Sequence, residues 1–325
     1  MEDKINLSFK PLQNINFLPR RLSWSPDGTS ILVTSFSTNN EILRDTDFLS
    51  SSLTIKTPST VTSCIWYPLM DSNNPASCAF ASVCPFCPIQ LIDSNDGHIR
   101  ASYRCQYGGD RAASLTSLMF NGSSILAGGT KTLFMCDISR PDQYGIPVLK
   151  CPGSILSING SETSACMSIG LTSGDLIIVD SRTYQCVLNL KFHNHGLDSQ
   201  RWINNCLITS ARLENEIYSI DIRSPNIPSY HFETERKTSR YISLSSNVKY
   251  LIIGNEGNKA EIYDIENDFK NIGCVGNGPT PLGVISPKNN IICAASGAFK
   301  IIESEEEEYN DVSFEPCLEQ FGLYY

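Results

Sequence analysis

Two short patterns in this chain carry residues that could bind a metal or do redox chemistry. Cys84 and Cys87 form a C-x-x-C pair, and His193 and His195 form an H-N-H pair. A zinc site needs a second pair of cysteines or histidines, and none follows at a suitable spacing. Histidines that alternate along an extended segment point to opposite sides and do not easily converge on one metal. We therefore predict no metal and no cofactor, and a metal or redox protein using Cys84 and Cys87 is the most distant hypothesis.

Catalytic patterns do not emerge from the sequence either. It contains no G-x-S-x-G turn, no G-x-x-x-x-G-K-[ST] phosphate loop and no H-E-x-x-H pattern. Most of the thirteen cysteines have a simpler role. Those inside apolar runs, such as Cys64, Cys136, Cys206 and Cys293, are expected to pack as small hydrophobic side chains. The sequence predicts that the protein is not an enzyme.

The elements that position these residues are short apolar runs, each ending in aspartate. The aspartates are Asp93, Asp137, Asp180, Asp221 and Asp264, spaced 44, 43, 41 and 43 residues apart. The runs are too short for helices and are rich in Ile, Val, Leu, Tyr and Phe, which favours strands. A period of about 40 to 45 residues is typical of a WD-repeat β-propeller.

A second set of apolar runs, ending in small residues, precedes most of the aspartates. There are seven: ILVTSF, CAFASV, ILAGGT, CMSIGLTSGD, CLITSA, YLIIGNEG and IICAASG. The sequence therefore predicts an all-β fold, a seven-bladed WD-repeat β-propeller that forms one domain over residues 1–325. The acidic residues 303–315 are predicted to form a loop or insertion in the last blade.

Charge and hydropathy restrict the partners. A net charge of -9 disfavours general electrostatic binding of nucleic acid. Much of it comes from the run ESEEEE at 303–308, so the body is close to neutral and local basic sites remain open. No run approaches the roughly 18 apolar residues of a membrane helix, and MEDKINLSFK does not resemble a signal peptide. We expect no membrane partner.

Irregular stretches between the repeats carry more specific information. The stretch 64–104 contains a C-W-Y-x-L-M-x-S element, formed by Cys64, Trp66, Tyr67, Leu69, Met70 and Ser72. It continues with D-x-x-x-G-x-x-R-A-S-Y-R, formed by Asp93, Gly97, Arg100, Ala101, Ser102, Tyr103 and Arg104. These elements, with W-S-P-D-G in 17–45 and S-A-R in 210–223, resemble the WD-repeat telomerase Cajal body protein family and its fungal splicing-associated relatives.

That resemblance implies a non-catalytic RNA-binding scaffold. The family recognises H/ACA-type small Cajal body RNAs and telomerase RNA and aids their localisation or particle assembly. Partners would be these small nuclear RNAs and H/ACA ribonucleoprotein proteins, with no small-molecule substrate. The expected location is the nucleus, in Cajal bodies or nucleoplasm, with the cytoplasm as a further site. The alternative is a WD-repeat protein–protein interaction adaptor with no direct RNA contact.

Candidate contacts follow from positions near the edges of the predicted blades. They are Arg20, Arg21, Trp66, Tyr67, Arg104, Tyr107, Arg212 and Arg240. Arginine and aromatic side chains suit this role because bases of single-stranded RNA stack on their planes. Packing in the core is the alternative for Trp66 and Tyr67, and pairing with a buried acid is the alternative for Arg212.

Overall fold

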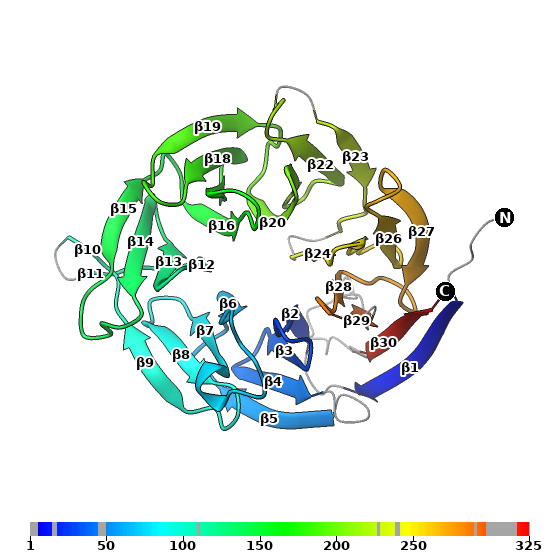
Figure 1. The fold of residues 1–325 in the computed structure, drawn as a ribbon, viewed down its shortest axis with the longest axis horizontal. Coiled ribbons are helices and arrows are strands. Elements are labelled where there is room, and N and C mark those ends of the chain that lie inside the picture. Colours follow the sequence, from blue (N-terminus) through cyan, green and yellow to red (C-terminus); the bar gives the residue numbers. More distant parts are fainter. Residues whose placement is uncertain are drawn as a thin grey trace, which may run out of the picture.

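The fold is a ring of four-stranded sheets (Figure 1). The computed structural model describes residues 6–14, 18–44, 50–108, 111–225, 228–237, 241–288, 291–296 and 317–324. Within these ranges the only helical element is the short 3-10 turn Pro75–Ser77. None of the described residues forms a helix long and apolar enough to cross a membrane. The predicted acidic segment 303–315 lies outside the described residues.

Six sheets each use four consecutive strands. Their first strands are β2 (Pro19–Trp24), β6 (Ser63–Trp66), β12 (Ser117–Asn121), β16 (Ile155–Gly160), β20 (Leu197–Ile203) and β24 (Leu244–Ser246). The second strands are β3 (Ser30–Ser35), β7 (Ala79–Val83), β13 (Ser124–Gly128), β17 (Cys166–Leu171), β21 (Cys206–Ala211) and β25 (Tyr250–Ile253). The third strands are β4 (Asn39–Arg44), β8 (Ile89–Asp93), β14 (Thr132–Asp137), β18 (Asp175–Asp180), β22 (Glu216–Asp221) and β26 (Ala260–Asp264). The fourth strands are β5 (Ser50–Lys56), β9 (Ile99–Tyr103), β15 (Ile146–Lys150), β19 (Cys186–Lys191), β23 (Tyr230–Glu233) and β27 (Lys270–Val275).

A seventh four-stranded sheet closes the ring and combines both ends of the chain. It contains β28 (Leu282–Ile285), β29 (Ile291–Ser296), β30 (Cys317–Tyr324) and β1 (Asn6–Asn14). Strand β1 pairs antiparallel with β30, with Phe9 opposite Phe321. A small hairpin, β10 (Gln106–Tyr107) with β11 (Arg111–Ala112), stands outside the seven sheets. The predicted all-β propeller is confirmed.

The hydrophobic core lies between neighbouring sheets. Second strands are covered on both sides, and every residue of β3 is buried. One cluster joins Leu126 and Leu133 of one sheet to Ile155 and Ile169 of the next. Because apolar area is buried at each joint, the core is distributed around the ring.

The three tryptophans each tie a first strand to the first strand of the preceding sheet. The indole Nε1 of Trp24 donates to the Val284 carbonyl oxygen at 3.3 Å. Trp66 donates to Ser23 at 3.0 Å, and Trp202 donates to Asn159 at 3.2 Å. These bonds connect equivalent ends of adjacent first strands, so the first strands run in the same direction around the ring.

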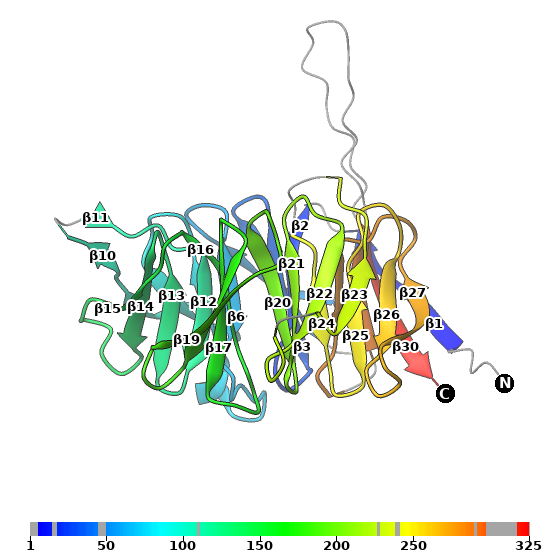
Figure 2. The same cartoon turned by 90° about the horizontal axis from the view of Figure 1, so that it is seen from above.

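The ring therefore has two distinct ends, seen from the side in Figure 2. First and third strands of an antiparallel sheet run the same way, so both end at the same face. We call this end the aspartate face, because the five repeated aspartates close the third strands there. The opposite end carries Arg20, Arg21 and Arg212 and is called the arginine face.

Candidate functional site

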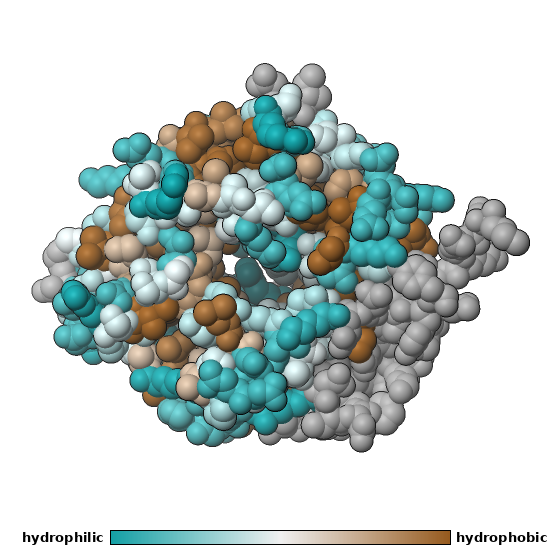
Figure 3. Space-filling model, viewed as in Figure 1, coloured by the Kyte–Doolittle hydropathy of each residue, from teal (hydrophilic) through white to brown (hydrophobic). Residues whose placement is uncertain are grey.

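The first strands surround a central channel, visible as an opening in Figure 3. Its volume is about 520 Å³. Small polar side chains line much of the wall, among them Ser117, Ser157, Ser199 and Ser243. Because β2 and β20 begin at the arginine face, their first residues form the mouth of the channel at that end.

Asp198 lies near the start of β20 and organises this mouth. It is only 3% exposed, and its carboxylate lies 3.6 Å from Arg212 Nε and 3.6 Å from Arg236 Nη2. Burial raises the pKa of Asp198, and the charges of Arg236, Arg212 and Arg21 oppose that rise. The side chain of Arg236 is fully buried, whereas that of Arg212 is 44% exposed. Asp198 therefore lies between the buried guanidinium group of Arg236 and the partly exposed one of Arg212.

Arg20 and Arg21 reach the same mouth from β2. The Arg20 Nη1 donates to the Val61 carbonyl oxygen at 2.8 Å, and its guanidinium carbon lies 5.7 Å from the centre of the Phe36 ring. The Arg21 guanidinium lies 4.3 Å from the centre of the Tyr241 ring. Burial, followed by the charges of Arg21 and Arg212, lowers the pKa of Arg20.

These contacts bring several positive charges together at the mouth of the channel in an acidic protein. Four arginines are coupled here: the charges of Arg236, Arg212 and Arg21 act on the buried carboxylate of Asp198, and those of Arg21 and Arg212 also act on Arg20. We call them the arginine cluster. Like charges at short range disfavour one another, so an anion placed between the exposed members would be stabilised.

The eight candidates from the sequence divide into separate groups. Arg20, Arg21 and Arg212 come together in the arginine cluster. The alternative for Arg212, a pairing with a buried acid, is also correct, because Asp198 is that acid. Arg104 is exposed, on the connection that follows β9. Arg240 lies outside the described residues.

The aromatic candidates pack within the protein. Trp66 is 6% exposed and packs in the core at the joint described above. Tyr67, at the aspartate face, is half-buried, and its ring packs edge-to-face against Phe120 with the ring centres 5.6 Å apart. Tyr107 is also half-buried, and its hydroxyl accepts a 2.5 Å hydrogen bond from the Thr130 amide. The packing alternative was correct for Trp66 because its indole fills the space between two sheets.

Asp198, Arg236 and Tyr241 belong to the mouth but were not among the candidates. Arg236 stands in a basic pair with Lys237, yet the sequence does not show that its side chain is buried. The pairing registers match Ser157 of β16 with Ser199 of β20, so Asp198 occupies the position that Leu156 has in the preceding first strand. This difference between neighbouring first strands is the sequence feature that could have identified Asp198.

The histidine pair is part of the scaffold. His193 is 2% exposed, and its Nδ1 lies 2.6 Å from Glu214 Oε2 while its Nε2 lies 3.1 Å from Thr209 Oγ1. Glu214 also accepts hydrogen bonds from the amides of Asn194 and His195. Burial lowers the pKa of His193, although the Glu214 carboxylate acts in the other direction. These hydrogen bonds connect the turn after β21 to the segment before β20. A neutral His193 can make them, because one ring nitrogen donates and the other accepts.

The cysteines near the C-x-x-C pair make internal contacts. Cys84 is 3% exposed, its Sγ donates to the Ser59 carbonyl oxygen at 3.1 Å, and burial raises its pKa. Cys78 donates in the same way to Asp71 at 3.4 Å. The twelve cysteines from Cys64 to Cys293 are free thiols. A neutral, hydrogen-bonded thiol is a poor metal ligand and a poor nucleophile.

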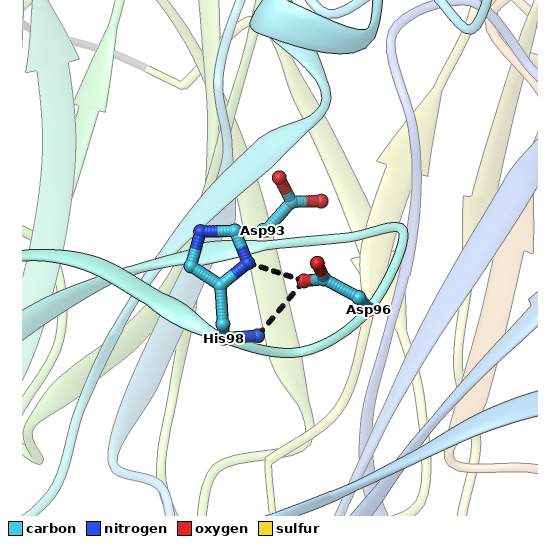
Figure 4. A group of neighbouring side chains, drawn as sticks. All are labelled: Asp93, Asp96 and His98. Carbon is cyan, nitrogen blue, oxygen red and sulfur yellow. Dashed lines mark hydrogen bonds and ion pairs between the residues drawn. The ribbon is translucent and has the colours of Figure 1, made fainter.

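Asp93, Asp96 and His98 form a cluster on the aspartate face (Figure 4). Asp96 lies 2.5 Å from His98 Nδ1. Asp93 accepts hydrogen bonds from Arg100 Nε at 2.9 Å and from the Asn95 amide at 2.7 Å. Because the Arg100 guanidinium already neutralises Asp93, this cluster does not favour a metal ion.

Comparison with known proteins confirms the resemblance found in the sequence. The chain is 26% identical over 78% of its length to Telomerase Cajal body protein 1 of Mesocricetus auratus, and equally to that of Rattus norvegicus. It is 30% identical over 37% of its length to the Telomerase Cajal body protein 1 homolog of Drosophila melanogaster, a match covering 25% of that protein. The chain spans about half the length of the two rodent relatives, 52% in each case. No family model matches.

Proposed function

We propose that the chain is a non-catalytic scaffold that binds single-stranded RNA at the arginine face. The observation that supports this most is the arginine cluster, in which Arg20, Arg21 and Arg212 are partly exposed beside the channel mouth. Guanidinium groups bind phosphates by paired hydrogen bonds and also stack on bases. A small cluster can hold a loop even though the whole protein is acidic, because recognition of single strands relies on base edges and stacking.

The RNA class is proposed from the relatives. Their names place them with telomerase and Cajal bodies. We therefore propose that the ligands are H/ACA-type small Cajal body RNAs, with telomerase RNA as a further ligand, bound together with H/ACA ribonucleoprotein proteins. The site of action would be the nucleus. Holding the RNA loop at a rigid face would aid localisation or particle assembly without any chemical step.

Co-precipitation followed by sequencing of the recovered RNA tests the ligand class. Enrichment of H/ACA RNAs over total nuclear RNA is the expected result. Recovery of proteins without RNA would overturn the proposal and favour the protein adaptor. A separate observation favours the protein adaptor. Two apolar side chains in turns of the aspartate face, Val248 and Leu69, are 86% and 75% exposed.

Charge variants test the location of the site. The double substitution Arg21→Gln and Arg212→Gln should weaken binding of a short single-stranded RNA and flatten its dependence on salt. Each lost phosphate contact reduces the slope of log affinity against log salt by about 0.7. The matched control is Arg182→Gln with Arg223→Gln, which removes the same charge from exposed arginines on the aspartate face. Equal losses in both double variants would contradict a site at the mouth.

A further inference from the structure

Phe86 stands at the tip of the turn between β7 and β8 with an unusual backbone. Its φ is 58°, and the residue is 68% exposed. Bulky side chains disfavour this left-handed region. The matching turn between β17 and β18 uses Gly174 at φ 86°, whereas two other matching turns hold Lys131 at φ 56° and Leu213 at φ 60°. A large apolar side chain kept in a costly conformation and in solvent points to a surface role.

The turn that carries Phe86 is held on both sides. Pro85 and Pro88 flank Phe86 and Cys87, and prolines restrict the backbone. The Cys87 amide donates to the Cys84 carbonyl oxygen at 3.2 Å, which closes the turn. The buried thiol of Cys84 then fixes the turn to Ser59, as described above. The Phe86 ring is therefore presented by a firmly anchored loop.

Ser59 belongs to the segment 57–61, and this segment connects the turn of Phe86 to the arginine cluster. Arg20 donates to Val61, and Thr60 Oγ1 donates to the Phe36 carbonyl oxygen at 3.0 Å. Phe36 is 40% exposed, and its ring lies under the Arg20 guanidinium. Two exposed phenylalanines and an arginine thus flank one segment, at the joint between the first two sheets and next to the channel mouth.

We propose that Phe86 and Phe36 are base-stacking platforms, and that bound single-stranded RNA runs from the channel mouth outward across this joint. The inference rests on the proposed function and specifies the path of its ligand. Aromatic rings next to guanidinium groups suit single-stranded RNA, whose bases stack while its phosphates meet positive charge. The fixed turn lowers the conformational entropy lost when a base stacks on Phe86.

Phe86→Gly separates a stacking role from a structural one. Glycine tolerates a φ of 58°, so the melting temperature should stay level or rise. Affinity for a short single-stranded RNA should fall about 5- to 100-fold, the range for loss of one aromatic–base stack. Leu213→Gly is the matched control, because Leu213 is also exposed and left-handed, at φ 60°, but has no ring. It should change the affinity less than Phe86→Gly.

A fluorescent adenine analogue, placed at successive positions of the RNA, reports stacking directly. Wild-type protein should quench the analogue at one or more positions, and Phe86→Gly should restore its emission there. RNA that binds with unchanged affinity and unchanged quenching in Phe86→Gly would overturn the stacking proposal and leave the proposed function standing. Wild-type protein that binds no RNA would instead overturn the proposed function. A lower melting temperature in Phe86→Gly alone would make Phe86 a structural residue.

Discussion

Asp27 lies in the turn after β2, in the sequence W-S-P-D-G that contributes to the family resemblance. Its carboxylate accepts a 2.6 Å hydrogen bond from Ser25 Oγ and a 2.8 Å bond from the Ser72 amide of the next sheet. Burial would raise the pKa of Asp27, but these bonds and those from Thr29 outweigh it and lower the pKa to about 2. One carboxylate thus joins two turns of the aspartate face.

Asp27→Ala should lower the free energy of unfolding by about 1–3 kcal/mol at neutral pH, since the Ser72 amide loses its acceptor. The folded pKa of about 2 is below the ordinary value of 3.8, so the ionised carboxylate stabilises the fold above pH 3.8. That contribution is lost as the pH falls through about 2. Urea unfolding of both proteins across this range measures it. The difference in the free energy of unfolding should narrow in acid, and a constant difference would contradict the assignment. Asp142→Ala, at an exposed aspartate, is the control.

At the scale of elements, the joints between sheets explain why the irregular stretches are so specific. The indole of Trp66 bridges two first strands. Arg100 Nη1 donates to the Ala76 carbonyl oxygen at 2.6 Å while its Nε binds Asp93, so it ties β9 to the 3-10 turn of the same sheet. Gly97 permits the turn between β8 and β9 through a φ of 79°. The residues that carry the resemblance in this stretch mainly build the scaffold.

Trp66→Phe should destabilise the protein without weakening RNA binding. The change leaves the Ser23 carbonyl oxygen without its donor and leaves a small cavity, at a cost of about 2 kcal/mol. Thermal unfolding and RNA titration of the same sample measure both effects. Weaker RNA binding with an unchanged melting temperature would instead indicate that Trp66 contacts the RNA.

The whole molecule depends on closure of the ring. Strand β1 supplies the outer edge of the last sheet, whose inner strand β28 contacts β2. The two termini therefore meet in one sheet, and the joint between β28 and β2 closes the ring. Sheet edges left unpaired are prone to association.

Removal of residues 1–14 should leave β30 with an open edge. We expect a lower melting temperature, a broader transition and concentration-dependent association, which differential scanning calorimetry and light scattering measure. A peptide of residues 6–14 added in excess should reverse part of the effect by pairing with β30. A monomeric truncated protein with an unchanged transition would show that β1 is dispensable for closure.

The sequence by itself determined the strands, their period and the propeller class, because alternating burial and turn chemistry are local properties. It also located Arg20, Arg21 and Arg212 near a blade edge. Only the tertiary structure decided which of the candidates meet. Asp198 and Arg236 are distant from Arg20 in the chain, and they come together because the first strands converge on one channel. The burial of Trp66 also depends on the tertiary structure, since the joint that its indole fills exists only once both sheets have formed.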